Sequence, residues 1–191
     1  MRLPGVILAG GQSRRMDGSE KAFLDFDGQA LITRTVARLS PQCEALAINA
    51  NGVPSRFEAL GLPVLPDEHT GHVGPLAGLS AAMTWAKSQG AEQVVTAPVD
   101  CPFLPLDLVD RLAAAGLAAV AESATGLHPV CGVWPVSAQV DIDDAIAKGA
   151  RRMRRAVDIT GAVSVPFAGD PDPFFNINTP DDLERGRSLL T

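Results

Sequence analysis

The sequence predicts an α/β fold in which a mostly parallel sheet carries helices on both faces. Two observations predict it: short aliphatic runs alternate with amphipathic stretches over residues 1–116, and a Gly-Gly loop directly follows the first run. Repeated β-α-β units of this kind build a three-layer, Rossmann-like domain. At 191 residues the chain is long enough for one such domain and short for two. We therefore expect a single domain over residues 1–191.

Strands and helices alternate along the first half of the chain. Runs of β-branched and aliphatic residues predict strands, whereas apolar residues at three- and four-residue spacing, such as Leu79, Ala82 and Met83, predict helices. The predicted strands cover residues 5–8, 45–49, 63–65 and 93–97, and the predicted helices cover residues 31–39, 55–60, 76–88 and 106–115. Because ligands of such sheets bind beyond the carboxyl ends of the strands, we expect the functional site at that edge.

The pattern changes after Gly116. Further strands are predicted at residues 118–122, 130–134 and 162–167, with helices at residues 141–148 and 152–157 between the last two strands. This less regular succession indicates a mixed edge on the sheet. Thr179 and Pro180 suit the N-cap and the first turn of a helix, and two acidic residues follow them, which predicts a last helix that ends near residue 190.

Composition excludes several classes of partner. The formal net charge of −6 argues against binding to a nucleic-acid backbone, which requires a basic surface. The three cysteines are an odd number at wide spacing, which favours reduced thiols in the cytoplasm over disulfides or a zinc site. His69, His72 and His128 are too scattered for a metal site and are expected in loops or the core. The N-terminal apolar run is too short for a signal peptide, and no other segment is long enough to span a bilayer. We therefore expect a cytoplasmic protein without a nucleic-acid or membrane partner.

The loop after the first predicted strand has the composition of a phosphate-binding site. Gly10 and Gly11 let backbone N–H groups approach an anion, because no Cβ stands in the way. Hydroxyl, guanidinium and ammonium groups follow closely, and they are donors of strong hydrogen bonds to phosphate oxygens. These donors belong to Ser13, Arg14, Arg15 and Lys21. The Walker A motif and the third glycine of G-x-G-x-x-G are both absent. A plain turn followed by solvated arginines is the simpler interpretation, but it leaves the convergence of so many donors unexplained.

The loop and its flanks resemble a known signature. Residues 8–24 read LAGGQSRRMDGSEKAFL, which is similar to the pattern L-A-G-G-x-S-x-R-M-G-x-x-K of nucleotidyltransferases, and specifically of molybdenum cofactor guanylyltransferases. Later segments agree with that family in the same order, so the resemblance spans nearly the whole chain. These segments are residues 66–67, 74–78, 98–103 and 176–180. Asp17 departs from the pattern, because it places a carboxylate where the signature has glycine.

The resemblance implies a nucleotidyltransferase domain in which residues 1–116 bind the nucleotide and residues 117–191 bind the molybdenum cofactor. Members of this family transfer the GMP moiety of GTP to the terminal phosphate of Mo-molybdopterin, which forms molybdopterin guanine dinucleotide and releases pyrophosphate. The implied metal cofactor is Mg²⁺, with Mn²⁺ as an alternative. The implied catalytic residues are Lys21, Arg15 and Asp100. The implied GTP-binding residues are Leu8, Ala9, Gly10, Gly11, Ser13, Arg14, Lys21, Asn49, Asp67, Gly78 and Asp100.

Asp100 is the candidate metal ligand. It comes directly after a β-branched strand, at the edge where the phosphates are expected. Magnesium in proteins is usually held by one or two carboxylates, with phosphates and waters in its other positions, so one well-placed Asp can suffice. A helix-capping Asp ahead of Pro102 and Pro105 is the alternative interpretation.

Asn49 and Asp67 are candidates for binding the base. Asn49 ends the second predicted strand and Asp67 follows the third, which places both at the same edge as the glycine loop. Guanine offers N1–H and N2–H₂ as donors, so a carboxylate such as Asp67 can select it over adenine. Polar residues at strand ends are also common turn formers, and this alternative stays open for Asn49.

The sequence gives fewer local signals for the residues that bind the second substrate. Arg152 belongs to a run of arginines in an otherwise acidic chain, and a phosphorylated pterin suits such a run, although most charge runs are solvated surfaces. Asn176 and Asn178 stand at alternate positions and would point the same way from an extended segment. The resemblance implies that Arg152, Asn176 and Asn178 bind molybdopterin. Gly74 and Gly78 flank a segment that suits either an anion site or a plain helix start.

Three alternative functions stay open at this point. A cytidylyltransferase acting on molybdopterin or a nucleotidyltransferase acting on a sugar phosphate would share the glycine loop and Asp100. A non-catalytic nucleotide- or cofactor-binding module is the third alternative, and Asp17 is the feature that favours it. The expected partners are GTP and molybdopterin as substrates, with molybdoenzymes or cofactor-delivery proteins as candidate protein partners.

Overall fold

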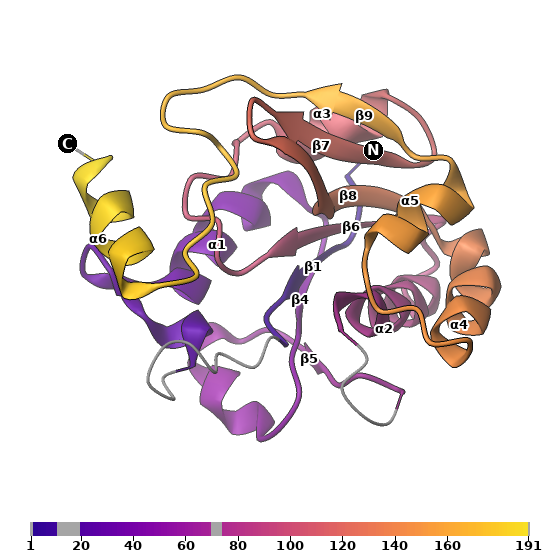
Figure 1. The fold of residues 1–191 in the computed structure, drawn as a ribbon. Helices are drawn as coiled ribbons and strands as arrows, with labels where there is room; N and C mark the ends of the chain where they lie inside the picture. Colours follow the sequence, from indigo (N-terminus) through magenta and orange to yellow (C-terminus); the bar gives the residue numbers. More distant parts are fainter. Residues whose placement is uncertain (1, 11–19, 70–73, 191) are drawn as a thin grey trace.

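A seven-stranded sheet forms the centre of the molecule (Figure 1). The computed structural model describes residues 2–10, 20–69 and 74–190. The strands lie in the order β5-β4-β1-β6-β8-β7-β9. Their bounds are β1 (Gly5–Leu8), β4 (Leu46–Asn49), β5 (Val64–Leu65), β6 (Gln93–Pro98), β7 (Ala119–Ser123), β8 (Gly126–Pro135) and β9 (Val163–Pro166). This sheet confirms the α/β prediction, and it contains strands from both halves of the chain.

The directions of the strands decide which ends meet. β1 pairs in parallel with β4 and β6, β4 with β5, and β7 with β9, whereas β8 runs antiparallel to both β6 and β7. The predicted mixed edge is thereby confirmed. Because β8 reverses direction between them, β6 and β7 point the same way, and the turn that joins β7 to β8 lies at the edge where β1, β4, β5 and β6 end.

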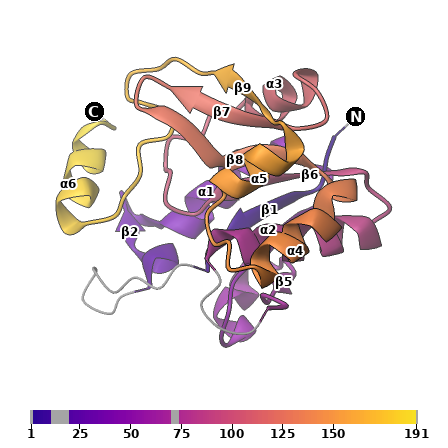
Figure 2. The same ribbon diagram turned by 45° about the vertical axis from the view of Figure 1, so that its right-hand side comes forward.

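Helices cover both faces of the sheet (Figure 2). Their bounds are α1 (Leu31–Leu39), α2 (Pro75–Ser88), α3 (Leu108–Ala114), α4 (Gln139–Ala147), α5 (Arg154–Thr160) and α6 (Pro180–Ser188). Successive strand residues point to opposite faces. Ile7 accordingly packs in one core cluster with residues of α1 and α3, and Val6 packs in another with residues of α2, α4 and α5. None of the helices in the described ranges combines the length and apolar character that a membrane crossing requires.

Local structure differs from the prediction in three places. Residues 55–60, predicted as a helix, form part of a 3₁₀ helix, η3 (Pro54–Leu60). β8 is longer than predicted at both ends, because its pairing with β6 and β7 extends it beyond the apolar run. An unpredicted hairpin joins β2 (Asp25–Phe26) to β3 (Gln29–Ala30), and its two-residue strands are too short to show a periodic pattern. The remaining 3₁₀ helices are η1 (Lys21–Phe23), η2 (Ser40–Gln42) and η4 (Val136–Ala138).

The last helix returns the end of the chain to the β2–β3 hairpin. Thr179 caps α6 as predicted, since its hydroxyl accepts a hydrogen bond from the backbone N–H of Asp182 and the Asp182 carboxylate accepts one from the N–H of Thr179. Fully buried Phe26 and Ile177 form a small core with Leu183 of α6 packed against it. This packing places the segment before α6 next to the end of β6.

Candidate active site

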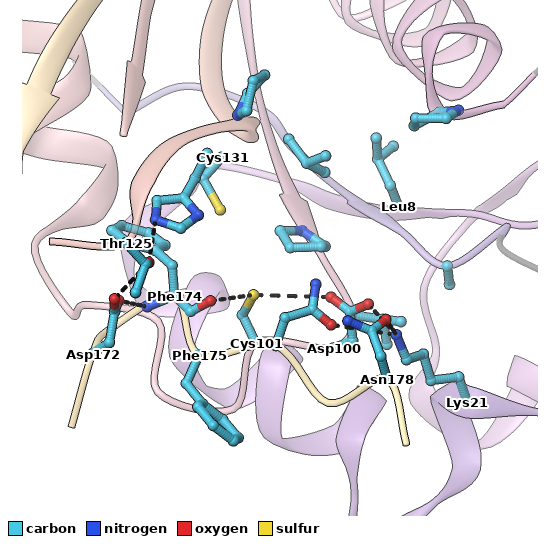
Figure 3. A pocket seen from close by; sticks show the side chains of 18 of the residues that line it. Leu8, Lys21, Asp100, Cys101, Thr125, Cys131, Asp172, Phe174, Phe175 and Asn178 are labelled. Carbon is cyan, nitrogen blue, oxygen red and sulfur yellow. Dashed lines mark hydrogen bonds and ion pairs between the residues drawn. The ribbon is translucent and has the colours of Figure 1, made fainter. Parts of the chain in front are cut away.

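The carboxyl ends of the strands border a cavity of about 1260 Å³ (Figure 3). One end of the cavity is lined by the segments that follow β1, β4 and β5, and the middle by the segment that follows β6. The β7–β8 turn and residues 170–174 line the other end, and Asn176 and Asn178 line the middle. The predicted residues that line the cavity are Leu8, Ala9, Gly10, Lys21, Asn49, Asp67, Asp100, Asn176 and Asn178. The strand-edge location predicted for the site is therefore the location of the cavity.

Lys21 lies in the middle of the cavity, where segments distant in sequence meet. Its Nζ is 2.5 Å from Oδ2 of Asp100 and 2.7 Å from Oδ1 of Asn178, and Oδ1 of Asn176 lies at 3.4 Å. The Lys21 and Asp100 side chains are only 16% and 15% exposed, so water screens this ion pair incompletely. Figure 3 shows Lys21, Asp100 and Asn178 converging on one point.

Backbone hydrogen bonds set the position of the two asparagines. The N–H of Ile177 donates to the carbonyl oxygen of Asp100 at 3.0 Å, which ties the segment before α6 to the end of β6. The N–H of Asn178 donates to Oδ2 of Asp182 at 2.9 Å, as an extension of the α6 cap. The structure therefore brings Asn176 and Asn178 to the lysine at the centre of the cavity.

At the β5 end of the cavity, two asparagines hold the carboxylate of Asp67. Nδ2 of Asn49 donates to Oδ1 of Asp67 at 2.9 Å, and Nδ2 of Asn51 donates to Oδ2 at 2.7 Å. The N–H of Asp67 donates in return to Oδ1 of Asn51 at 2.9 Å. Each carboxylate oxygen keeps a lone pair for a further donor. Asn51 was missed in the sequence, although its position two residues after Asn49 at the end of a strand was a usable signal.

Gly78 lies beneath Asn49. A Cβ at Gly78 would come within 2.4 Å of Oδ1 of Asn49, a distance that requires one of them to move. Gly78 is buried in α2 and is not among the residues that line the cavity. Its absent side chain therefore makes room for Asn49, which is 3% exposed and also donates to the carbonyl oxygen of Leu65 at 3.0 Å.

Several predicted residues are not part of the described cavity. Gly11, Ser13, Arg14 and Arg15 lie outside the described residues, as does Asp17. The side chain of Arg152 is exposed and does not line the cavity. Its neighbour Arg151 accepts a backbone hydrogen bond from Leu76 at the start of α2, so this segment lies close to the rim of the cavity.

The far end of the cavity carries a polar cluster that the sequence did not reveal. Thr125, His128 and Asp172 line it, together with Phe174. Burial lowers the pKa of His128, although the nearby Asp172 acts in the opposite direction. Burial by itself raises the pKa of Asp172, but hydrogen bonds from the N–H of Phe174 and from the hydroxyls of Thr125 and Ser123 outweigh it and lower the pKa. A neutral imidazole and an ionised carboxylate therefore stand side by side near neutral pH.

The buried cysteines are free thiols, as predicted. Cys101 and Cys131 both line the cavity between its centre and its far end. A hydrogen bond with Cys131 and burial raise the pKa of Cys101. Its Sγ lies 3.6 Å from the carbonyl oxygen of Phe174, which links the segment after β6 to residues 170–175.

Asp100 has the chemistry of a ligand for a hard divalent cation. Its Oδ2 pairs with Lys21, while Oδ1 has the weak thiol donor of Cys101 at 3.8 Å. Within residues 2–10, 20–69 and 74–190, no group of three or more His, Cys, Asp or Glu side chains could hold a metal. A single carboxylate of this kind suits a magnesium ion that would take its other ligands from substrate phosphates and water.

Comparison with known proteins agrees with this geometry. Residues 5–162 match the family described as "MobA-like NTP transferase domain". A protein from Cereibacter sphaeroides named molybdenum cofactor guanylyltransferase is 50% identical over 100% of this chain and 98% of its own length. A protein of that name from Rhodobacter capsulatus is also 50% identical, over 100% of this chain and 97% of its own length. The crystal structure of molybdopterin-guanine dinucleotide biosynthesis protein A from Archaeoglobus fulgidus has a TM-score of 0.77 and 26% identity, and covers 98% of each chain. The chain therefore belongs to the MobA-like NTP transferases, and within them to the molybdenum cofactor guanylyltransferase family.

Proposed function

We propose that this nucleotidyltransferase transfers GMP from GTP to the terminal phosphate of Mo-molybdopterin, with formation of molybdopterin guanine dinucleotide and release of pyrophosphate. The observation that carries the proposal is the Lys21–Asp100 pair in the middle of a cavity that has a prepared carboxylate, Asp67, at one end. The names of the full-length relatives support the choice of substrates.

The reaction needs positioning more than proton transfer. An oxygen of the molybdopterin phosphate attacks the α-phosphorus of GTP, and the bond from that phosphorus to the α–β bridging oxygen breaks as pyrophosphate leaves. The nucleophile is already ionised near neutral pH, so no general base is required. The chain has to align the two phosphates and offset the negative charge that grows on the leaving group.

Lys21 is suited to that electrostatic role. Its ammonium sits between Asp100 and the two asparagines, so three acceptors from two segments hold its position before any phosphate arrives. A phosphate oxygen can replace one of these neutral amide acceptors at little cost in reorganisation. The N–H groups near Gly10 and the guanidinium of Arg15 are the further donors that we assign to the phosphates. Bound Mg²⁺ or Mn²⁺, held by Asp100, would supply additional positive charge at the phosphates.

Guanine selection belongs to Asp67 in this proposal. With Asn49 and Asn51 fixing the plane of its carboxylate, Asp67 can accept hydrogen bonds from N1–H and N2–H₂ of guanine. Adenine and cytosine do not present that pair of donors, so they would leave the remaining lone pairs of the partly buried carboxylate incompletely satisfied. Leu8, Ala9 and Gly10 line the path from this end of the cavity to its centre and complete the nucleotide site.

The proposal extends to the setting of the enzyme. We assign it to the cytoplasm, where GTP is supplied and where three reduced cysteines are stable. Its product is destined for molybdoenzymes, and they or a cofactor-delivery protein are the protein partners that we propose.

Pyrophosphate release tests the proposed function. The purified protein is incubated with Mg²⁺, molybdopterin and GTP, CTP or ATP in parallel. Release with GTP alone is the expected result. Release with CTP instead would assign the chain to cytidylyl transfer, and GTP binding without any release would indicate a binding module.

A further inference from the structure

The cluster at the far end of the cavity is a chain of hydrogen bonds. Nε2 of His128 lies 2.8 Å from Oγ of Ser123, and that hydroxyl donates to Oδ2 of Asp172 at 2.8 Å. Thr125 also donates to Oδ2 of Asp172 at 2.8 Å, and the N–H of Phe174 donates to Oδ1 at 2.8 Å. The function proposed above uses none of these residues.

Two acceptor atoms of the cluster have unused hydrogen-bonding capacity. A carboxylate offers about four lone-pair sites, and three of those on Asp172 are in use, so Oδ1 can accept one more hydrogen bond. A serine hydroxyl has a single proton, and Ser123 gives it to Asp172. Nε2 of His128 must therefore donate to Ser123, which leaves Nδ1 as an unprotonated acceptor. Nδ1 has no hydrogen-bond partner among the described residues.

The cluster also packs against aromatic rings. The His128 ring stacks on Phe174 with a centroid distance of 4.6 Å and an interplanar angle of 28°, and Phe174 packs edge-on against Phe167. Phe174 is 3% exposed, so it fixes the plane of the imidazole from the core side. In Figure 3 Thr125, Asp172 and Phe174 lie on one side of the view, while Lys21, Asp100 and Asn178 lie on the other.

We propose that Asp172 and His128 form the pterin-recognition end of the site, where they accept hydrogen bonds from the 2-amino-4-oxopyrimidine edge of the second substrate. This inference rests on the proposed function, which supplies a pterin as that substrate. The 2-amino group and N3–H of a pterin are adjacent donors, and two residues that line this end keep acceptor capacity, on Oδ1 of Asp172 and Nδ1 of His128. A ring with a carbonyl oxygen in place of the 2-amino group keeps N3–H but sets one acceptor against another at position 2.

Sheet topology separates this end of the cavity from the end that the proposed function assigns to guanine. Asp67 follows β5, two strands from the β1 loop, whereas the β7–β8 turn that carries Ser123 and Thr125 lies three strands away on the opposite side. Five inter-strand steps of about 4.8 Å separate β5 from β7, on the order of 24 Å in all. Guanine and pterin both carry a ring N–H next to an amino group. A cavity with a carboxylate held in place at each end, Asp67 and Asp172, therefore matches a product that carries both rings.

Kinetics of Asp172→Asn test the assignment. The amide keeps the size of the side chain but loses the charge of the acceptor. We expect the KM for molybdopterin to rise by about ten- to a hundredfold and the KM for GTP to stay within about twofold of the wild-type value. Retained GTP binding shows that the variant is folded. Asp158→Asn on α5 removes the same charge from an exposed side chain and serves as the matched control, with no change expected.

A binding measurement separates this inference from the proposed function. Calorimetric titration compares 6-hydroxymethylpterin with 6-hydroxymethyllumazine, in which an oxygen replaces the 2-amino group. The wild-type protein should prefer the pterin by about tenfold or more, and Asp172→Asn should lose that preference.

Three results would overturn the assignment. They are equal binding of the two rings by the wild-type protein, a preference that survives in the variant, and a rise in the KM for GTP in place of that for molybdopterin. If the wild-type protein prefers the pterin but releases no pyrophosphate, the proposed function fails while the recognition end stands.

Discussion

The two ends of the cavity hold a carboxylate in different ways. At the β5 end, amide groups of Asn49 and Asn51 hold Asp67, and all three residues lie at or just after the ends of the neighbouring parallel strands β4 and β5, within 18 positions of one another. At the β7 end, hydroxyl and backbone N–H groups hold Asp172, which is 49 positions from Ser123 in sequence. The first end is a product of local β-α-β order, and the second exists only because a distant segment folds back beside the β7–β8 turn.

This difference predicts that a substitution at one end of the cavity impairs the binding of one substrate, whereas a substitution at the centre impairs the reaction of both. Lys21 contacts Asp100 from the first half and Asn178 from the second, so it joins the two ends. Variants of the centre should abolish turnover, whereas variants of one end should raise the KM for one substrate.

The largest effect is expected from Lys21→Ala. Removal of the ammonium takes away charge stabilisation in the transition state and leaves Asp100 without its ion pair, so kcat should fall by about a thousandfold. Initial rates of pyrophosphate release measure this loss. Lys87→Ala, at an exposed position near the end of α2, is the control. Turnover close to wild type in Lys21→Ala would show that the centre of the cavity does not stabilise the transition state through Lys21.

The next effect is expected from Asp67→Asn. An amide can offer only one acceptor oxygen to guanine, so the KM for GTP should rise by about ten- to a hundredfold while the KM for molybdopterin is unchanged. Steady-state rates with each substrate varied in turn provide both values. The neighbouring exposed Glu68→Gln controls for loss of a charge. An equal rise in both KM values would mean that the two ends do not act independently.

Gly78→Ala should have a smaller effect through Asn49. The added Cβ would stand 2.4 Å from Oδ1 of Asn49, and relief of this overlap should cost about 1–3 kcal/mol of unfolding free energy. The KM for GTP should rise less than in Asp67→Asn, because the Asn51 bond to Asp67 remains. Urea denaturation measures the cost. The double variant with Asn49→Ala is the check: if the clash is with Asn49, the cost of the alanine at position 78 shrinks in that background.

The smallest effect is expected from Thr179→Ala. Loss of the hydroxyl that accepts from the N–H of Asp182 at 3.1 Å should lower the unfolding free energy by about 1 kcal/mol. Asp182 still accepts from the backbone of Asn178, so base preference should not change. Thermal or urea unfolding gives the value, and Ser188→Ala at the other end of α6 is the matched control. A shift in base preference would show that α6 influences the β5 end as well.

Much of the first half of the site could be predicted from the sequence. Asn49, Asp67 and Asp100 each follow a short apolar run, and in a parallel sheet the ends of such runs must share an edge. Lys21 was identified from its chemistry near a Gly-Gly loop. Asn51 was missed because a polar residue beyond a strand end is usually a turn former.

The second half could not be predicted in the same way. Ser123 and His128 lie on either side of the β7–β8 turn, but Asp172 lies in the segment after β9, and no periodicity relates that segment to β7. The direction of β8 determines where Ser123 and Thr125 lie. Because β8 runs antiparallel to both β6 and β7, the turn at its start lies at the edge of the sheet that borders the cavity. Asn176 and Asn178 were identified from a motif, but their contact with Lys21 was not expected.

The sequence by itself determined the α/β class, the strands of the parallel half, the N-cap of α6 and the edge at which the site lies, because each depends on a local pattern or on neighbours along the chain. Tertiary structure decided which residues contact one another across the sequence. These contacts are Lys21 with Asn178, Gly78 beneath Asn49, and Asp172 with Ser123 and Thr125. Such contacts depend on strand order and direction and on the packing of α6 against Phe26, and those are set by the burial of the whole core rather than by any one segment.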